Sequence, residues 1–165
     1  MKTGKIIPLE KKSWIAHTIH LEECECKLDS GENFYLLYNK WKEKFFLFDS
    51  NGKLLIYTNP AYSGLKKYIN NPAFLFFNVK EDKPIAEINR KYVNYNIIVD
   101  SEKKSLKRKK GKSGIAWESS LFKFEIPYYQ HTYDIEINEE KKEISLIILY
   151  SLLYLEETQI DSSLG

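Results

Sequence analysis

A dense run of cations is the first feature of the sequence that could do chemistry. Seven of the ten residues from position 103 to 112 are basic: Lys103, Lys104, Lys107, Arg108, Lys109, Lys110 and Lys112. Such a charge density attracts phosphate groups, whether on lipid headgroups or on nucleic acid. Nucleic acid is disfavoured as the ligand because single-strand platforms interleave aromatic rings with the cations, and this run has none. A solvated loop without a specific ligand is a competing interpretation of equal weight.

No catalytic motif can be assembled from the other residues. Gly111-Lys112-Ser113 resembles the end of a phosphate-binding loop, but Leu106 stands where that loop requires its first glycine. Ser63 lacks the flanking glycines of a hydrolase nucleophile elbow. His131 has no acidic partner that the sequence identifies, so it is expected to be an ordinary strand residue. The sequence therefore predicts a protein without enzymatic activity.

A metal site is also disfavoured, although the residue types that zinc prefers are present. His17, His20, Cys24 and Cys26 lie within ten positions of one another. On a strand, His17 and His20 would point to opposite faces, and a single residue between two cysteines is not the spacing of a zinc knuckle. We expect no metal and no cofactor.

The composition is that of one soluble domain spanning residues 1–165. Hydrophobic residues make up 43% of the chain and charged residues 29%, near the averages for globular proteins. Aromatic residues, at 15%, are abundant and favour β-sheet. No apolar run near the start has the length of a secretory signal, and Cys24 and Cys26 are too close for an unstrained disulfide. A cytoplasmic protein with reduced thiols is expected.

Turn signals and apolar runs alternate through most of the chain, as in a meandering antiparallel sheet. Asn51-Gly52 separates the runs Phe45 to Phe48 and Leu54 to Tyr57, which predicts a tight hairpin. A similar unit spans Phe74 to Ile88, and residues 1–31 supply a leader with the first strands. The basic run looks too charged for a buried strand, so we expect it to be a loop.

The apolar segment Ile144 to Leu155 predicts a buried helix over residues 143–157. Twelve helical residues span only about 18 Å, well short of a bilayer core, so a transmembrane span is disfavoured. A helix that is apolar on nearly every side needs a partner all round, and β-sheet is the only partner available. This predicts a closed or nearly closed antiparallel β-barrel threaded by its own C-terminal helix.

The pattern resembles the tubby C-terminal-like superfamily, which includes the LURP-one-related proteins and small bacterial members. The resembling parts are the strand, turn and strand from Phe45 to Tyr57, its looser copy from Phe74 to Ile88, and the closing Tyr133 to Asn138 before the apolar helix. The resemblance implies a closed barrel of about twelve strands around a central hydrophobic helix. For function it implies phosphoinositide binding through basic residues, as in some members, with no catalytic motif.

The leading functional hypothesis is a non-enzymatic binding module whose basic loop contacts anionic membrane lipid, peripherally and from the cytoplasm. The alternative is a protein–protein interaction, such as that of an accessory or immunity-type protein, with no lipid role. A barrel holding a small apolar ligand is disfavoured because the helix would already occupy the lumen.

Overall fold

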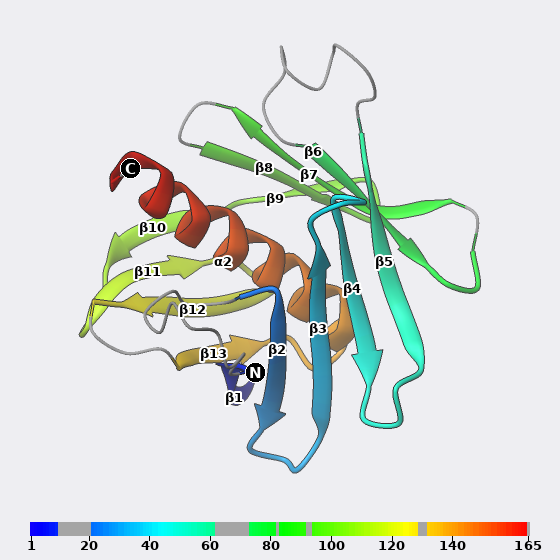
Figure 1. The fold of residues 1–165 in the computed structure, drawn as a ribbon, viewed down its shortest axis with the longest axis horizontal. Helices are drawn as coiled ribbons and strands as arrows, with labels where there is room; N and C mark the ends of the chain where they lie inside the picture. Colours follow the sequence, from blue (N-terminus) through cyan, green and yellow to red (C-terminus); the bar gives the residue numbers. More distant parts are fainter. Residues whose placement is uncertain (10–20, 62–72, 82, 92–93, 129–131, 165) are drawn as a thin grey trace.

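Thirteen strands and one helix make up the described part of the chain, as Figure 1 shows for the computed structural model. The structure describes residues 1–9, 21–61, 73–81, 83–91, 94–128 and 132–164. The strands are β1 (Lys2–Pro8), β2 (Glu23–Leu28), β3 (Asn33–Asn39), β4 (Lys44–Asp49), β5 (Leu54–Pro60), β6 (Ala73–Asn78), β7 (Pro84–Lys91), β8 (Asn94–Val99), β9 (Glu102–Lys104), β10 (Lys107–Lys110), β11 (Gly114–Glu118), β12 (Phe122–Pro127) and β13 (Tyr133–Ile137). The helix is α2 (Lys142–Leu164). The predicted β-rich fold with a C-terminal helix is confirmed.

Side chains alternate between the two faces of the sheet, and one face forms the core. In β4, Phe45 and Leu47 are fully buried, whereas Phe46 and Phe48 between and after them are half-buried on the opposite face. This is the two-residue period of a pleated strand. We call the buried side of the sheet its inner face and the other side its outer face.

Helix α2 fills the space enclosed by the inner face. Every residue from Ser145 to Leu155 is buried, so the helix has packing partners on all sides. It packs against β4, β5, β12 and β13, and Figure 1 shows β10–β13 on one side of the helix and β6–β8 on the other. The predicted helix is confirmed, and it extends beyond residue 157 to Leu164.

The hairpin predicted at Asn51-Gly52 is confirmed between β4 and β5. Gly52 has φ +80°, a conformation that side chains with a Cβ rarely adopt. The Asp49 carboxylate accepts hydrogen bonds from the backbone N–H groups of Asn51 and Lys53, each at 2.9 Å. The second predicted unit is confirmed as well, because β6 pairs with β7.

The sheet is not closed, so the closed barrel that the sequence predicts is not confirmed. The strand order is β10-β11-β12-β13-β1-β2-β3-β4-β5-β6-β7-β8-β9, and every neighbouring pair is antiparallel. Strands β9 and β10 are the two edges and do not pair with each other. The N-terminal strand β1 lies inside the sheet, between β13 and β2. We call the space between β9 and β10 the opening of the sheet.

Candidate functional site

The basic segment, Lys103 to Lys112, lies along the opening of the sheet. Its first half belongs to β9, which pairs with β8, and its second half to β10, which pairs with β11. Only Ser105 and Leu106 join these two edge strands. Most of the segment is therefore strand rather than the loop that the sequence predicts. The prediction failed because it considered only a buried strand, whereas an edge strand with exposed side chains can carry many charges.

The two edges run in the same direction, so the basic segment crosses the opening without turning back. Strand direction alternates at each step of the strand order, and there are twelve steps from β10 at one end to β9 at the other. The two edge strands are therefore parallel to each other. Three residues of extended chain span at most about 11 Å, which limits the separation of the Lys104 and Lys107 Cα atoms. One charged segment thus lines both edges of a sheet that curls almost completely around α2.

Most cations of the basic segment form no ion pair with a carboxylate of the described residues. Lys104 pairs with Glu102 at 2.9 Å and Lys109 with Glu118 at 2.5 Å. These hydrogen bonds hold the pKa of each carboxyl below its usual value. The other five cations form no ion pair with a described carboxylate; they are Lys103, Lys107, Arg108, Lys110 and Lys112. Their charge is available to an anionic ligand.

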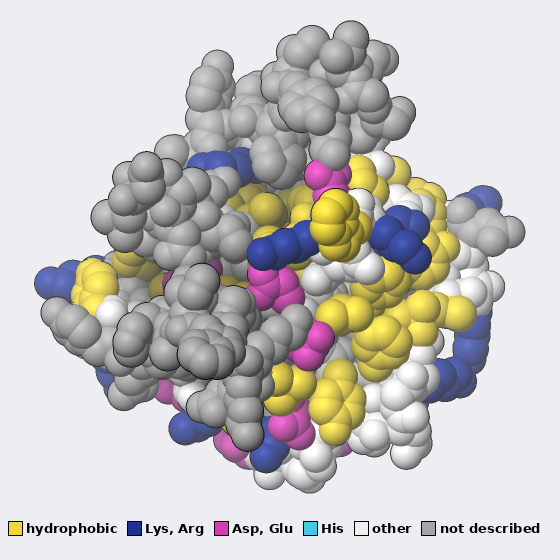
Figure 2. Space-filling view, in the orientation of Figure 1, with side chains coloured by type: hydrophobic (Ala, Val, Ile, Leu, Met, Phe, Trp, Pro, Cys, Tyr) yellow, Lys and Arg dark blue, Asp and Glu magenta, His cyan; other side chains and the backbone are white. Residues whose placement is uncertain are grey.

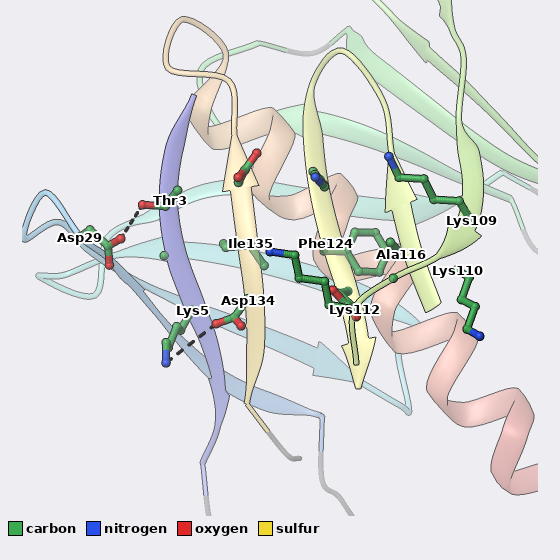
Figure 3. A pocket seen from close by; sticks show the side chains of 15 residues that line it. Thr3, Lys5, Asp29, Lys109, Lys110, Lys112, Ala116, Phe124, Asp134 and Ile135 are labelled. Atoms are coloured by element: carbon green, nitrogen blue, oxygen red, sulfur yellow. Dashed lines mark hydrogen bonds and ion pairs between the residues drawn. The ribbon is translucent and has the colours of Figure 1, made fainter. Parts of the chain in front are cut away.

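Alternate residues of β10 point to opposite sides of the strand, as the side chains of Lys109 and Lys110 do in Figure 3. Arg108 lies opposite Trp117, and its guanidinium carbon is 5.5 Å from the centre of that indole ring. This distance fits a cation–π contact. Arg108 therefore contacts a buried ring of the core, although all four residues of β10, Arg108 included, are exposed to solvent.

Aromatic side chains fill the opening next to Arg108. The Trp117 ring meets the Tyr95 ring of β8 edge-on, with centroids 5.9 Å apart. The Tyr95 hydroxyl donates to the Glu156 carboxylate of α2 at 2.6 Å. Burial, reinforced by this carboxylate, raises the pKa of Tyr95. The two edges of the sheet are thus joined by side chains and by the helix where backbone hydrogen bonds are absent.

A groove of about 740 Å³ lies on the outer face beside β10 (Figure 3). Both signs of charge line it: the cations are Lys5, Lys109, Lys110, Lys112 and Lys123, and the carboxylates are Asp29, Glu125, Asp134 and Glu136. Lys5 forms an ion pair with Asp134 at 3.8 Å, and Thr3 donates a hydrogen bond to Asp29. The groove therefore suits a ligand that itself carries both signs of charge.

The turn between β10 and β11 is built around the Glu125 carboxylate. One carboxylate oxygen accepts hydrogen bonds from the Ser113 N–H at 2.5 Å and from its hydroxyl at 3.1 Å. A Cβ at Gly111 would lie 2.4 Å from the same oxygen, so a larger residue there would have to displace the Glu125 carboxylate. The Gly111-Lys112-Ser113 motif is therefore occupied by a protein carboxylate, which agrees with its exclusion as a phosphate-binding loop.

The cysteines give no sign of reactivity or metal binding. Cys24 and Cys26 are free and fully buried on the inner face of β2. Burial raises the pKa of each thiol to about 12, so both stay protonated at neutral pH. Among the described residues, no group of three or more histidine, cysteine, aspartate or glutamate side chains could hold a metal ion. His17, His20, Ser63 and His131 lie outside the described residues.

Two exposed aromatic residues were missed by the sequence analysis. Trp41, in the turn between β3 and β4, is 98% exposed, and Tyr128 is 65% exposed. The signal for Trp41 is its place in Lys40-Trp41-Lys42, an aromatic residue between two cations outside any apolar run. The mixed-charge groove had no such signal, because β1, β10, β12 and β13 meet there only in the folded sheet.

The comparisons with known proteins identify no protein that is similar to this chain. No protein-family model matches the sequence, and neither a curated protein nor a solved structure shows significant similarity to the chain. None of the described helical residues form a helix that is long and apolar enough to cross a membrane.

Proposed function

We propose that this chain is a non-enzymatic binding module that docks peripherally on an anionic membrane surface through its basic segment. The observation that carries the proposal is the set of five cations that form no ion pair with a described carboxylate; four of them lie on the two edge strands at the opening of the sheet, and Lys112 lies in the turn that follows β10. Cations held near an anionic leaflet each contribute about 1 kcal/mol of binding free energy. Membership of the tubby-like superfamily, and a cytoplasmic location, belong to the same proposal. The antiparallel sheet wrapped around a C-terminal helix supports the superfamily membership.

Binding to vesicles of defined lipid tests the proposal. The protein is sedimented with neutral or anionic vesicles at low and at physiological salt. The test variant replaces Lys107, Arg108, Lys109 and Lys110 with serine. A matched control replaces four exposed lysines on other elements, Lys27, Lys53, Lys80 and Lys83, and changes the formal net charge equally, from +2 to −2.

The proposal predicts binding of the wild type to anionic vesicles alone, weakened by salt. Loss of the four cations should reduce binding by roughly 3 to 4 kcal/mol, several hundredfold or more. The control variant should retain most of the binding, because its lost charges lie away from the opening. Equal losses in both variants, or no binding by the wild type, would refute a membrane role for the basic segment.

The second candidate function is the binding of a protein partner, favoured by the mixed charges of the groove beside β10. The excess charge of an anionic membrane is negative, whereas a protein surface can offer cations and carboxylates in a fixed arrangement to Lys112, Lys123, Asp134 and Glu136 together. This candidate becomes the stronger one if wild-type protein binds no vesicle. Its test is the Asp134→Lys variant, which should abolish capture of the partner without reducing vesicle binding.

A further inference from the structure

Trp41 is the most exposed large hydrophobic side chain among the described residues. It is 98% exposed, whereas the next, Tyr128, is 65% exposed. Exposed lysines flank it on both sides, Lys40 and Lys42. Single apolar residues on a surface are common, so exposure alone says little about function. The turn that holds Trp41, and the surface beside it, supply the further observations.

The turn holds the backbone of Trp41 at the tip of the hairpin. The Asn39 side-chain oxygen accepts hydrogen bonds from the backbone N–H groups of Trp41 at 3.0 Å and of Lys42 at 3.1 Å. Glu43 completes the turn with φ +55°. The structure thus displays an indole to solvent on a defined support.

The base of the same hairpin packs against the helix through aromatic rings. Tyr38 and Phe45 lie directly opposite each other in β3 and β4, with ring centroids 4.5 Å apart. Both rings contact Tyr154 of α2, at 4.2 Å and 5.6 Å between centroids. Burial raises the pKa of Tyr38 to about 12, so its ring stays neutral at neutral pH. The base of the hairpin is therefore part of the packed core.

An apolar outer surface continues from the hairpin across the sheet. Leu37 lies opposite Phe46, Phe46 opposite Tyr57, and Tyr57 opposite Phe77, in one row over β3 to β6. The Tyr57 and Phe77 rings stack at 5.5 Å, and Phe46 stacks with Phe48 at 6.2 Å. Figure 2 shows hydrophobic side chains gathered over β3, β4 and β5. The residues of this row are only half-buried.

We infer that the β3–β4 hairpin is an interfacial membrane anchor, in which Trp41 enters the headgroup region of an anionic bilayer and Lys42 and Lys44 contact lipid phosphates. Tryptophan favours the boundary between hydrocarbon and headgroups because its ring is amphipathic. Lysines beside such a ring lay their apolar stems along the lipid and keep their ammonium groups at the phosphates. Lys40 forms an ion pair with Glu22 at 2.7 Å. Lys42 and Lys44 form no ion pair with a described carboxylate, so their charge remains for the lipid contact.

This inference rests on the proposed function and extends it. Electrostatic attraction alone gives reversible, salt-sensitive membrane binding, and stable docking needs a second signal such as an inserted apolar group. The basic segment would supply the first signal and Trp41 the second. The hairpin belongs to β3 and β4, far from β10 in the strand order, so the two contributions can be removed separately.

Vesicle partition combined with tryptophan fluorescence tests the anchor. The chain has three tryptophans, so wild type and a Trp41→Phe variant are compared, and the difference in emission reports Trp41 alone. Vesicles of anionic lipid carry bromine atoms on the acyl chains near the headgroups, where they quench an inserted indole. A Trp41→Ala variant measures the contribution to binding. Val79→Ala, at an exposed valine of the β6–β7 turn, is the matched control.

The anchor predicts a blue-shifted, bromine-quenched Trp41 signal and a roughly tenfold weaker partition of the Trp41→Ala variant, as expected for one side chain withdrawn from water. Val79→Ala should bind like wild type. Wild-type binding that depends on the basic segment, with neither quenching of Trp41 nor a loss in Trp41→Ala, would overturn the anchor and leave the proposed function intact. A wild type that binds no vesicle would overturn both.

Discussion

The contact between Tyr95 and Trp117 should hold the two edges of the sheet together across the opening. The perturbation is a double-mutant cycle with Tyr95→Leu, Trp117→Leu and the double variant. Loss of the bond from the Tyr95 hydroxyl to Glu156 occurs in both variants that lack Tyr95, so it cancels in the coupling energy. The coupling then reports the ring contact itself.

The magnitude follows from the ring geometry. The centroids are 5.9 Å apart and the planes meet at 76°, which is the edge-to-face arrangement that aromatic pairs prefer. Such pairs contribute about 0.5 to 1.5 kcal/mol beyond the area they bury. Each single substitution should cost about 2 to 4 kcal/mol, because both rings are almost fully buried. We therefore expect a coupling of about 1 kcal/mol in the free energy of unfolding.

Urea unfolding measures the coupling, and amide hydrogen exchange locates the damage. Faster exchange in the Trp117→Leu variant should concentrate in β8–β11, because no backbone hydrogen bonds join β9 to β10. The control cycle is Phe45 with Phe74, whose edge-on rings are 5.1 Å apart within continuously paired strands. A similar coupling is expected there, without local loss of protection. A coupling near zero for Tyr95 and Trp117, or loss of protection spread evenly over the sheet, would refute the reasoning.

Two further predictions concern titratable groups. Glu32 accepts hydrogen bonds from Lys142 and Lys2, which lower its pKa from 4.5 to about 2. The depressed pKa stabilises the fold above about pH 4.5, and this contribution is lost as the pH falls toward 2. Glu32→Gln should therefore cost about 1 kcal/mol at neutral pH, since the carboxyl is partly exposed, and the unfolding curves of variant and wild type should converge near pH 2. A constant difference across that range would contradict this assignment. Separately, Cys24 and Cys26 should resist a thiol reagent in the native protein and react fully in urea, because their burial raises both pKa values to about 12. Rapid native labelling measured by mass spectrometry would contradict their placement in the core.

Local signals in the sequence predicted much of the fold. The positive φ of Gly52 and the side-chain bonds of Asp49 are turn chemistry that four residues specify by themselves. The helix could be predicted because a segment apolar on every side is stable only where other elements of the fold bury it. Its further extent to Leu164 has no such signal, since polar residues follow Leu155.

The open edge between β9 and β10 and the conformation of the basic segment depend on strand pairings that the sequence does not show. Pairing of Arg108 with Trp117 and of Lys103 with Ile98 joins residues whose register no local pattern fixes. Charge argued against a strand there, but lysines on exposed edge strands are a common protection against edge-to-edge association. The same residues thus have a structural role in addition to the proposed lipid contact. The groove beside β10 was unpredictable for a related reason, as it needs β1 and β13 to meet.

The order of elements along the chain sets the sequence of events during synthesis. All sheet neighbours are consecutive in the chain except the pair β1 and β13, so most of the sheet can form from hairpins as they leave the ribosome. Helix α2 follows every strand that the structure describes, however, so until it emerges the inner face of the nascent sheet lacks the helix that covers it in the folded protein. Ribosome-bound chains that end before Lys142 should accordingly be the ones that recruit chaperones.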